Sequence, residues 1–162
     1  MAEQSNWSRE DGTFVAPLVV SYPYSRTVGT QLSRFFTSLM EGRLEGTRGS
    51  DGRVYFPPAE FDPLTGDRLT DWVSLSEEGS VTSWTWQALP EEGHPLDRAF
   101  AWALVVLDGA DVPVLHAVDA GDPTRIATGS RVRVRWAEER TGGMTDIACF
   151  DLLESGKAGG GS

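Results

Sequence analysis

Cysteine and histidine are scarce in this sequence. Its 162 residues contain one cysteine, Cys149, and two histidines, His94 and His116. A single cysteine excludes an internal disulfide and a cysteine-based zinc cluster, and neither histidine has a second ligand at metal spacing. No serine lies in a nucleophile elbow. His116 lies on an apolar strand face, and we interpret both His116 and Cys149 as structural residues. The alternative for His116 is a ligand-binding or catalytic role. The alternative for Cys149 is a role as a nucleophile.

Basic residues are outnumbered, with 14 lysines and arginines against 24 acidic residues and a formal net charge of −10. Such a surface repels nucleic-acid phosphates and anionic membranes, so neither is an expected partner. The sequence also lacks the run of about 20 apolar residues that spans a bilayer, and its N-terminus lacks the features of a signal peptide. We therefore expect a cytoplasmic protein.

Aromatic residues, in contrast, are plentiful: six tryptophans and seven phenylalanines contribute to a hydrophobic share of 40%. This composition predicts a globular protein with a packed core. No glycine-rich phosphate loop precedes a helix, and no paired carboxylates share a regular element, so we expect no cofactor and no catalytic centre.

The chain divides into five segments by composition. Residues 1–29 form a polar tail and an apolar arm interrupted by prolines, 30–43 a helix, 44–72 a turn-rich knuckle, 73–153 a barrel, and 154–162 a flexible glycine-rich tail. Prolines exclude the arm from a central strand, so it is predicted to lie extended on a partner surface.

One apolar stripe at helical spacing predicts the helix. Its members are Leu32, Phe35, Phe36, Leu39 and Met40. Gly29 or Thr30 is the expected cap, and Gly42 ends the helix.

The second half of the chain has the pattern of strands separated by turns. The predicted strands are Trp72–Leu75, Ser80–Ala88, Phe100–Leu107, Val112–Asp119, Arg131–Ala137 and Thr145–Leu152. Five or six strands without a helical period indicate a mainly β protein with a small barrel of the OB-fold type.

Two strands carry features with alternative interpretations. Arg131, Arg133 and Arg135 alternate with apolar residues, which suggests either a single-strand nucleic-acid platform or, as we favour, an ion-paired outer face. Trp84 and Trp86 form either a core slab or an exposed anchor; we assign Trp84 to the core and Trp86 to an interface.

The knuckle carries the most specific motif. The run Arg53-Val54-Tyr55-Phe56-Pro57-Pro58 lies between two glycine-ended turns. This arrangement resembles the domain-of-unknown-function 35 family, which pairs a rubredoxin-like zinc ribbon with an OB fold. In that family two cysteines of each turn bind zinc. The corresponding positions here are Arg48, Asp51, Asp62 and Thr65, so the resemblance implies a zinc-less member. Arg48 facing Asp51 or Asp62 could replace the metal; the alternative is a plain loop held by the packing of Tyr55 and Phe56.

The resemblance also implies a function. Relatives are non-catalytic subunits bound to thiolase-like or aldolase-like enzymes, sometimes with indirect contact to a CoA thioester; the opening of the chain resembles actinobacterial members linked with lipid and steroid side-chain degradation. The alternative is a free-standing OB module that binds acyl-CoA or another small ligand. Candidate partner-binding residues come from the arm, helix, knuckle and barrel: Val20, Tyr22, Tyr24, Arg26, Phe35, Phe36, Tyr55, Phe56 and Trp86.

Overall fold

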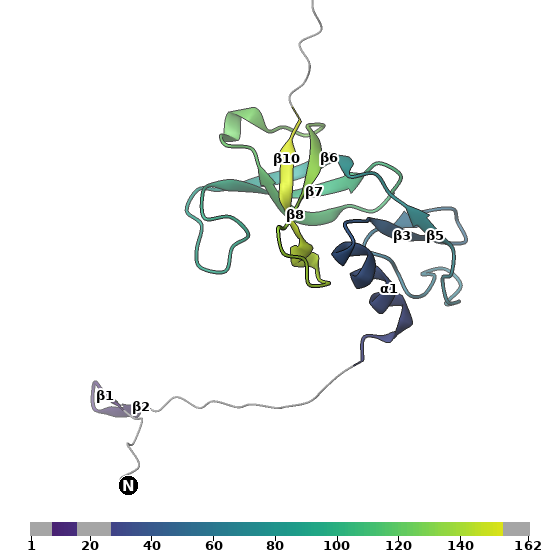
Figure 1. The fold of residues 1–162 in the computed structure, drawn as a ribbon. Coiled ribbons are helices and arrows are strands. Elements are labelled where there is room, and N and C mark those ends of the chain that lie inside the picture. The colour runs from purple at the N-terminus through teal and green to yellow at the C-terminus, as the bar shows by residue number, and fades with distance from the viewer. Residues whose placement is uncertain (1–7, 16–26, 154–162) are drawn as a thin grey trace, which may run out of the picture.

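A five-stranded barrel forms the larger part of the protein, shown in Figure 1 as a computed structural model that describes residues 8–15 and 27–153. Its strands are β6 (Glu78–Gln87), β7 (Phe100–Leu107), β8 (Val114–Asp119), β9 (Arg131–Trp136) and β10 (Ile147–Leu152). They close in the order β10-β8-β7-β6-β9. The predicted mainly β fold with an OB barrel is confirmed.

Alternation of side chains explains how the barrel fills its interior. On β9, Val132 and Val134 are buried, while the arginines between them lie on the outer side. On β6 a bulge between Val81 and Ser83 shifts this alternation. Thr82 and Ser83 are therefore both exposed, and Trp84 packs against the core. The bulge lets a long strand curve around the barrel without losing its inward-facing residues.

Strands β8 and β10 close the barrel only at one end. They are parallel and pair through Val118 with Phe150 and Asp119 with Asp151, near the ends of both strands. The start of β10 is preceded by the short 3-10 helix η2 (Met144–Asp146), although the sequence pattern predicts a strand from Thr145. Asp146 accepts hydrogen bonds from the backbone N–H groups of Thr141 and Gly142, which favours a tight turn here over an extended strand.

A second, three-stranded sheet lies beside the barrel, in the order β4 (Val54–Tyr55), β3 (Glu45–Arg48), β5 (Trp72–Ser74). The predicted strand Trp72–Leu75 thus belongs to this small sheet and not to the barrel. Strand β3 has no counterpart in the prediction because its sequence, Glu-Gly-Thr-Arg, lacks apolar alternation. A Cβ at Gly46 would lie 2.5 Å from the carbonyl oxygen of Tyr55, so only glycine fits this pairing.

Helix α1 (Gly29–Met40) packs next to the small sheet (Figure 1). Val28 precedes it without a side-chain cap, so the cap prediction is wrong. The predicted end is confirmed: Gly42 has φ +72°, and its N–H donates to the carbonyl of Leu39 at 2.9 Å. Leu39 is fully buried, but the stripe is only partly covered, because Leu32 and Met40 are exposed.

The N-terminal tail contains structure that its composition does not predict. Strands β1 (Ser8–Glu10) and β2 (Thr13–Val15) form an antiparallel hairpin. Asp11 and Gly12 at the turn both have positive φ, 48° and 84°. Asp-Gly is a favoured sequence for such a two-residue turn, so this part of the polar tail forms a local hairpin. Another 3-10 helix, η1 (Pro123–Arg125), lies between β8 and β9. No helix in the described ranges is long and apolar enough to cross a membrane.

Candidate functional site

The two turns of the knuckle are joined by one carboxylate. Asp62 is buried, and its Oδ2 accepts the backbone N–H of Ser50 at 2.6 Å while its Oδ1 accepts the N–H of Leu64 at 2.8 Å. Hydrogen bonds from Ser50 and then Leu64 hold the pKa of Asp62 below its usual range. A single charged side chain therefore connects the turn before β4 with the turn after it.

The other positions that the resemblance matches to zinc ligands have different partners. Arg48 pairs with Asp71, with Nε 3.3 Å from Oδ2, and donates to the carbonyl of Gly52. It does not contact Asp51 or Asp62, so the idea that Arg48 replaces the metal through these carboxylates is wrong. Asp51 accepts the N–H of Arg53 at 3.0 Å.

Thr65 uses its hydroxyl to accept the N–H of Asp67 at 3.2 Å. Within the described part of the chain, no group of three or more histidine, cysteine, aspartate or glutamate side chains could hold a metal ion. Whether the protein carries zinc stays a prediction.

Two of the predicted partner-binding residues are buried. Phe35 and Phe56 are 2% and 1% exposed and meet edge to face, with ring centroids 5.8 Å apart. They join helix and knuckle to the core, which removes both from the surface open to a partner. Phe36, Tyr55 and Trp86 are half-buried and keep some accessible surface. The arm residues Val20, Tyr22, Tyr24 and Arg26 lie outside the described residues.

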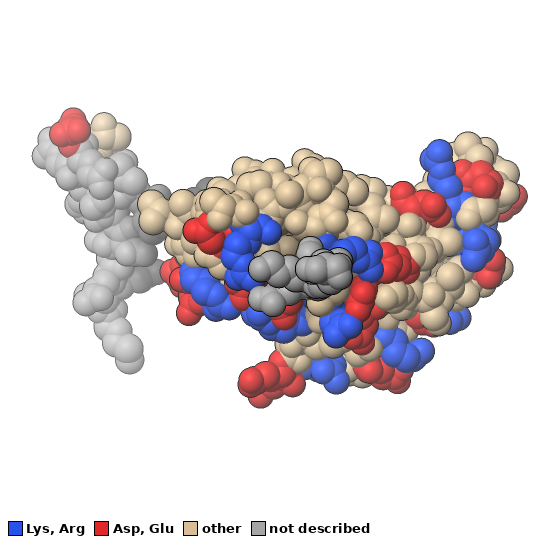
Figure 2. All heavy atoms as spheres, turned by 90° about the horizontal axis from the view of Figure 1, so that it is seen from above, with Lys and Arg blue, Asp and Glu red and all other residues tan. Residues whose placement is uncertain are grey.

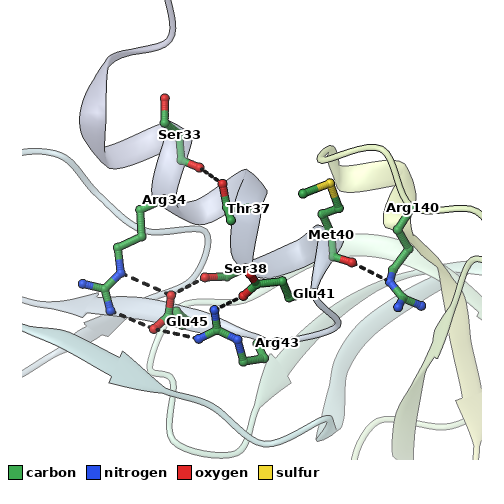
Figure 3. A network of polar contacts seen from close by, with 9 residues as sticks. All are labelled: Ser33, Arg34, Thr37, Ser38, Met40, Glu41, Arg43, Glu45 and Arg140. Carbon is green, nitrogen blue, oxygen red and sulfur yellow. Dashed lines mark hydrogen bonds and ion pairs between the residues drawn. The ribbon is translucent and has the colours of Figure 1, made fainter.

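A polar network fixes the helix on the small sheet (Figure 3). Glu45 on β3 is buried and accepts hydrogen bonds from Arg34, at 2.8 and 3.3 Å, and from the hydroxyl of Ser38. The hydrogen bonds from Arg34 are the main cause that lowers the pKa of Glu45, against an upward effect of burial. Arg34 also covers the ring of Trp72 at 4.2 Å. These contacts join the helix to the small sheet.

The far end of the helix is held by the barrel. Arg140, between β9 and β10, donates from Nε to the carbonyl of Met40 at 2.9 Å (Figure 3). A last-turn carbonyl has no partner inside its own helix, so this bond satisfies an otherwise free acceptor. Helix, small sheet and barrel are therefore linked by direct contacts.

Exposed apolar side chains gather where the arm enters the helix. A hollow of about 500 Å³ is lined by Thr27, Val28, Gly29, Leu32 and Glu60. Val28 and Leu32 are exposed, as is Phe61 next to Glu60 in the knuckle. We call this the arm-proximal surface. Large apolar side chains left in water at one place are typical of an interaction surface.

A separate cleft opens on the barrel. It has a volume of about 420 Å³, and its walls include His94, Pro95, Trp102, His116, Met144 and Ile147. Burial lowers the pKa of His116, and backbone groups of Ala117, Met144 and Ile147 offset this in part. The Nδ1 atom of His116 is buried and has no hydrogen-bond partner among the described residues. A buried nitrogen without a partner costs about 1–3 kcal/mol, so such an atom marks a place where a ligand or water can bind.

Neither Cys149 nor His94 forms a catalytic arrangement. Burial raises the pKa of Cys149 to about 11, so the thiol is protonated at neutral pH and lies fully buried under the loop before β7. A protonated, inaccessible thiol is a poor nucleophile. His94 accepts the N–H of Glu91 at 3.0 Å and stands edge to face with Phe100 and Trp102. The structural interpretation of Cys149 agrees with these contacts.

The three arginines of β9 are paired with acids. Arg131 contacts Asp108 and Glu78, Arg133 contacts Glu78, and Arg135 contacts Asp151 and Asp119. Charges of both signs alternate over the face in Figure 2, and no extended basic patch stands alone there. These contacts agree with the ion-paired interpretation and leave no free cationic groove along the strand.

The geometry defines an OB-fold module with an attached helix and a small three-stranded sheet. A family model described as "ChsH2, C-terminal OB-fold domain" matches residues 72–137. A curated "DUF35 domain-containing scaffold protein" from Pyrococcus furiosus is 29% identical over 105 residues, which cover 64% of this chain and 76% of the relative.

Two solved structures have the same fold. A DUF35-family protein of unknown function from Sulfolobus solfataricus has a TM-score of 0.57 at 17% identity, over 77% of this chain and 83% of its own. The "Ltp2-ChsH2(DUF35) aldolase" has a TM-score of 0.55 at 20% identity, over 79% and 97%. The chain therefore has an OB fold and resembles proteins of the DUF35 family in sequence and structure.

Proposed function

We propose that this chain is a non-catalytic accessory subunit of an aldolase-like or thiolase-like enzyme that processes acyl-CoA substrates, and that the partner enzyme supplies the catalytic groups. The curated relative is named a scaffold protein, and one structural neighbour is an aldolase formed with a DUF35 subunit. A role in lipid or steroid side-chain degradation belongs to the same proposal and rests on the family resemblance alone.

The observation that carries the proposal is the arm-proximal surface. It combines exposed apolar side chains with a hollow at the point where the N-terminal arm meets α1. Burying one leucine-sized side chain contributes about 1.5–3 kcal/mol before ordering costs are subtracted. Burial of several such residues together favours binding of a partner, whereas an isolated monomer would leave them in water.

The state of the titratable groups supports a non-catalytic role. Cys149 is buried as a thiol, and Nδ1 of His116 has no hydrogen-bond partner among the described residues. The carboxylates at the barrel rim are engaged by arginines, as Asp119 is by Arg98 and Arg135. Side chains committed to such structural contacts are poorly suited to act as acids or bases.

Co-expression with a thiolase-like or aldolase-like protein of the same organism tests the proposal. We expect a stable complex whose turnover depends on the partner's catalytic residues. Deleting residues 1–29 should weaken the complex while circular dichroism shows an intact barrel. Replacing Cys149 by alanine should leave the turnover within a few-fold.

Turnover of an acyl-CoA by the purified chain alone would show that the proposal is wrong. So would loss of activity on Cys149→Ala in a folded complex. If the chain forms no complex and behaves as a stable monomer, the alternative of a free-standing ligand-binding OB module replaces the proposal.

A further inference from the structure

The barrel cleft lies where β8 and β10 diverge. The two strands pair only near their ends, at Val118 with Phe150 and at Asp119 with Asp151. Further back along each strand, His116 and Ile147 line the cleft from opposite sides of this opening. The opening therefore follows from the barrel's topology, and the loop that carries His94 and Pro95 forms its outer wall.

The walls of the cleft favour an uncharged ligand. None of the lining residues is an aspartate, glutamate, lysine or arginine. Burial lowers the pKa of His116, so the imidazole is neutral at physiological pH and supplies no charge. A charged ligand would lose its hydration without gaining an opposite charge, which is strongly unfavourable.

The aromatic groups around the cleft favour a ring. Trp102 stands edge to face with His94, at a centroid distance of 6.1 Å, and His116 stands edge to face with Phe150, at 5.6 Å. Aromatic walls accept another ring in the same edge-to-face geometry. The volume of about 420 Å³ lies within the range of sites for small molecules.

The imidazole of His116 supplies one polar contact. Nδ1 of His116 is buried without a hydrogen-bond partner among the described residues, whereas Nδ1 of His94 is already occupied by the N–H of Glu91. In a neutral imidazole one nitrogen donates and the other accepts. A hydroxyl group can do both, so it suits either tautomer.

We propose that this cleft binds a compact, uncharged molecule with an apolar ring and one hydroxyl group, which hydrogen-bonds to His116. The proposal is independent of the accessory function, because it concerns the barrel alone and needs no partner enzyme. It assigns a role to the one buried polar atom that the described structure leaves without a partner.

The test compares 4-methylphenol with toluene, which has a similar ring and no hydroxyl. Nuclear magnetic resonance titration of the full-length, isotope-labelled chain should show saturable shifts at the cleft residues for both probes. 4-Methylphenol should bind about fivefold more tightly, the effect of one additional hydrogen bond. His116→Leu, which keeps the volume, should remove this difference.

Two further variants locate the site. Ala148→Phe places a ring in the cleft and should abolish binding of both probes. Leu115→Ala, on the exposed neighbouring position of β8, should bind both probes as the unmodified chain does. Equal affinities of the unmodified chain for the two probes, or shifts that do not map to the cleft, overturn the proposal even if His116→Leu fails to fold.

Discussion

The carboxylate of Asp62 lies 2.6 Å from the backbone nitrogen of Ser50, twelve residues away in the chain. The same carboxylate accepts the N–H of Leu64 in its own turn. A metal in a zinc ribbon joins two turns by binding side chains from both. Asp62 joins them by accepting hydrogen bonds from backbone N–H groups. This interaction does not depend on the side chain at Ser50. This explains how both turns keep their positions although the arginine predicted to hold them pairs with Asp71 instead.

Replacing Asp62 by asparagine should destabilise the protein. Asparagine keeps one acceptor oxygen but places an NH₂ group against one of the two backbone donors, so one turn loses its bond. We expect the melting temperature to fall by roughly 3–6 °C. Asp67→Asn in the same turn is the matched control, because its side chain is exposed, and should change the melting temperature by less than about 1 °C. An equal effect of both substitutions would contradict this role of Asp62.

The contribution of Asp62 should depend on pH. Its pKa is lowered in the folded protein, whereas an aspartate in an unfolded chain titrates near about 3.9. The stability that the ionised Asp62 contributes to the folded protein is therefore fully present above that value. It is lost as the pH falls through the folded-state pKa. Urea unfolding of the native protein and Asp62→Asn from about pH 7 to about pH 3 should show a stability difference that shrinks in acid. A difference that grows in acid would exclude a stabilising charged form.

Zinc should be absent from the purified protein. A structural site needs about four ligands, and the corresponding positions offer an arginine, a threonine and two aspartates, of which Asp62 is bound to backbone N–H groups. Metal analysis of protein purified without chelators should give far less than one equivalent. Near-stoichiometric zinc that resists dialysis would contradict the prediction.

The barrel was predictable from the sequence because its signals are local. Alternating valines on β9 and the unbroken apolar run of β7 define strands whichever partners they have. The turn at Asp108 and Gly109 marks a hairpin by itself. Long-range pairing decides the rest: β5 has the pattern of a barrel strand but pairs with β3, and nothing in residues 72–74 indicates which sheet they join.

The candidate site was less predictable, since burial depends on the whole fold. Phe35 and Phe36 are equally apolar neighbours in the helix, yet only Phe35 faces Phe56 in the core. The role of Asp62 depends on a hydrogen bond from the backbone N–H of residue 50. Almost every residue type has this group, so the sequence at Ser50 does not reveal the bond. The cleft results from the splaying of β8 and β10, and only the isolated His116 within an apolar strand hints at it.

Glu45→Gln should loosen helix α1 from the small sheet. Glutamine keeps the shape but loses the charge that Arg34 and Ser38 contact. We expect urea unfolding to show a loss of about 1–2 kcal/mol, moderated because Arg34 is half exposed. Glu41→Gln removes an exposed pair with Arg43 and should cost less than about 0.5 kcal/mol. If the two variants are equally stable, the network in Figure 3 does not anchor the helix.

Leu32→Gln should weaken binding of the partner enzyme. Leu32 lines the hollow of the arm-proximal surface and is 38% exposed, so the substitution removes apolar contact area without opening a cavity in the core. Glutamine is also a good helix former, which protects α1. Losing one well-buried leucine at an interface should raise the dissociation constant at least about tenfold, measured by calorimetry with the purified partner.

Leu115→Gln is the matched control for this experiment. Leu115 is 60% exposed on the outer face of the barrel, so the substitution removes a similar apolar group from a surface that the proposal leaves free. The dissociation constant should then change by less than about twofold, because distant exposed substitutions have small effects. Circular dichroism should show both variants folded. If Leu115→Gln weakens the complex and Leu32→Gln does not, the partner docks on the barrel, and the arm-proximal surface has another role.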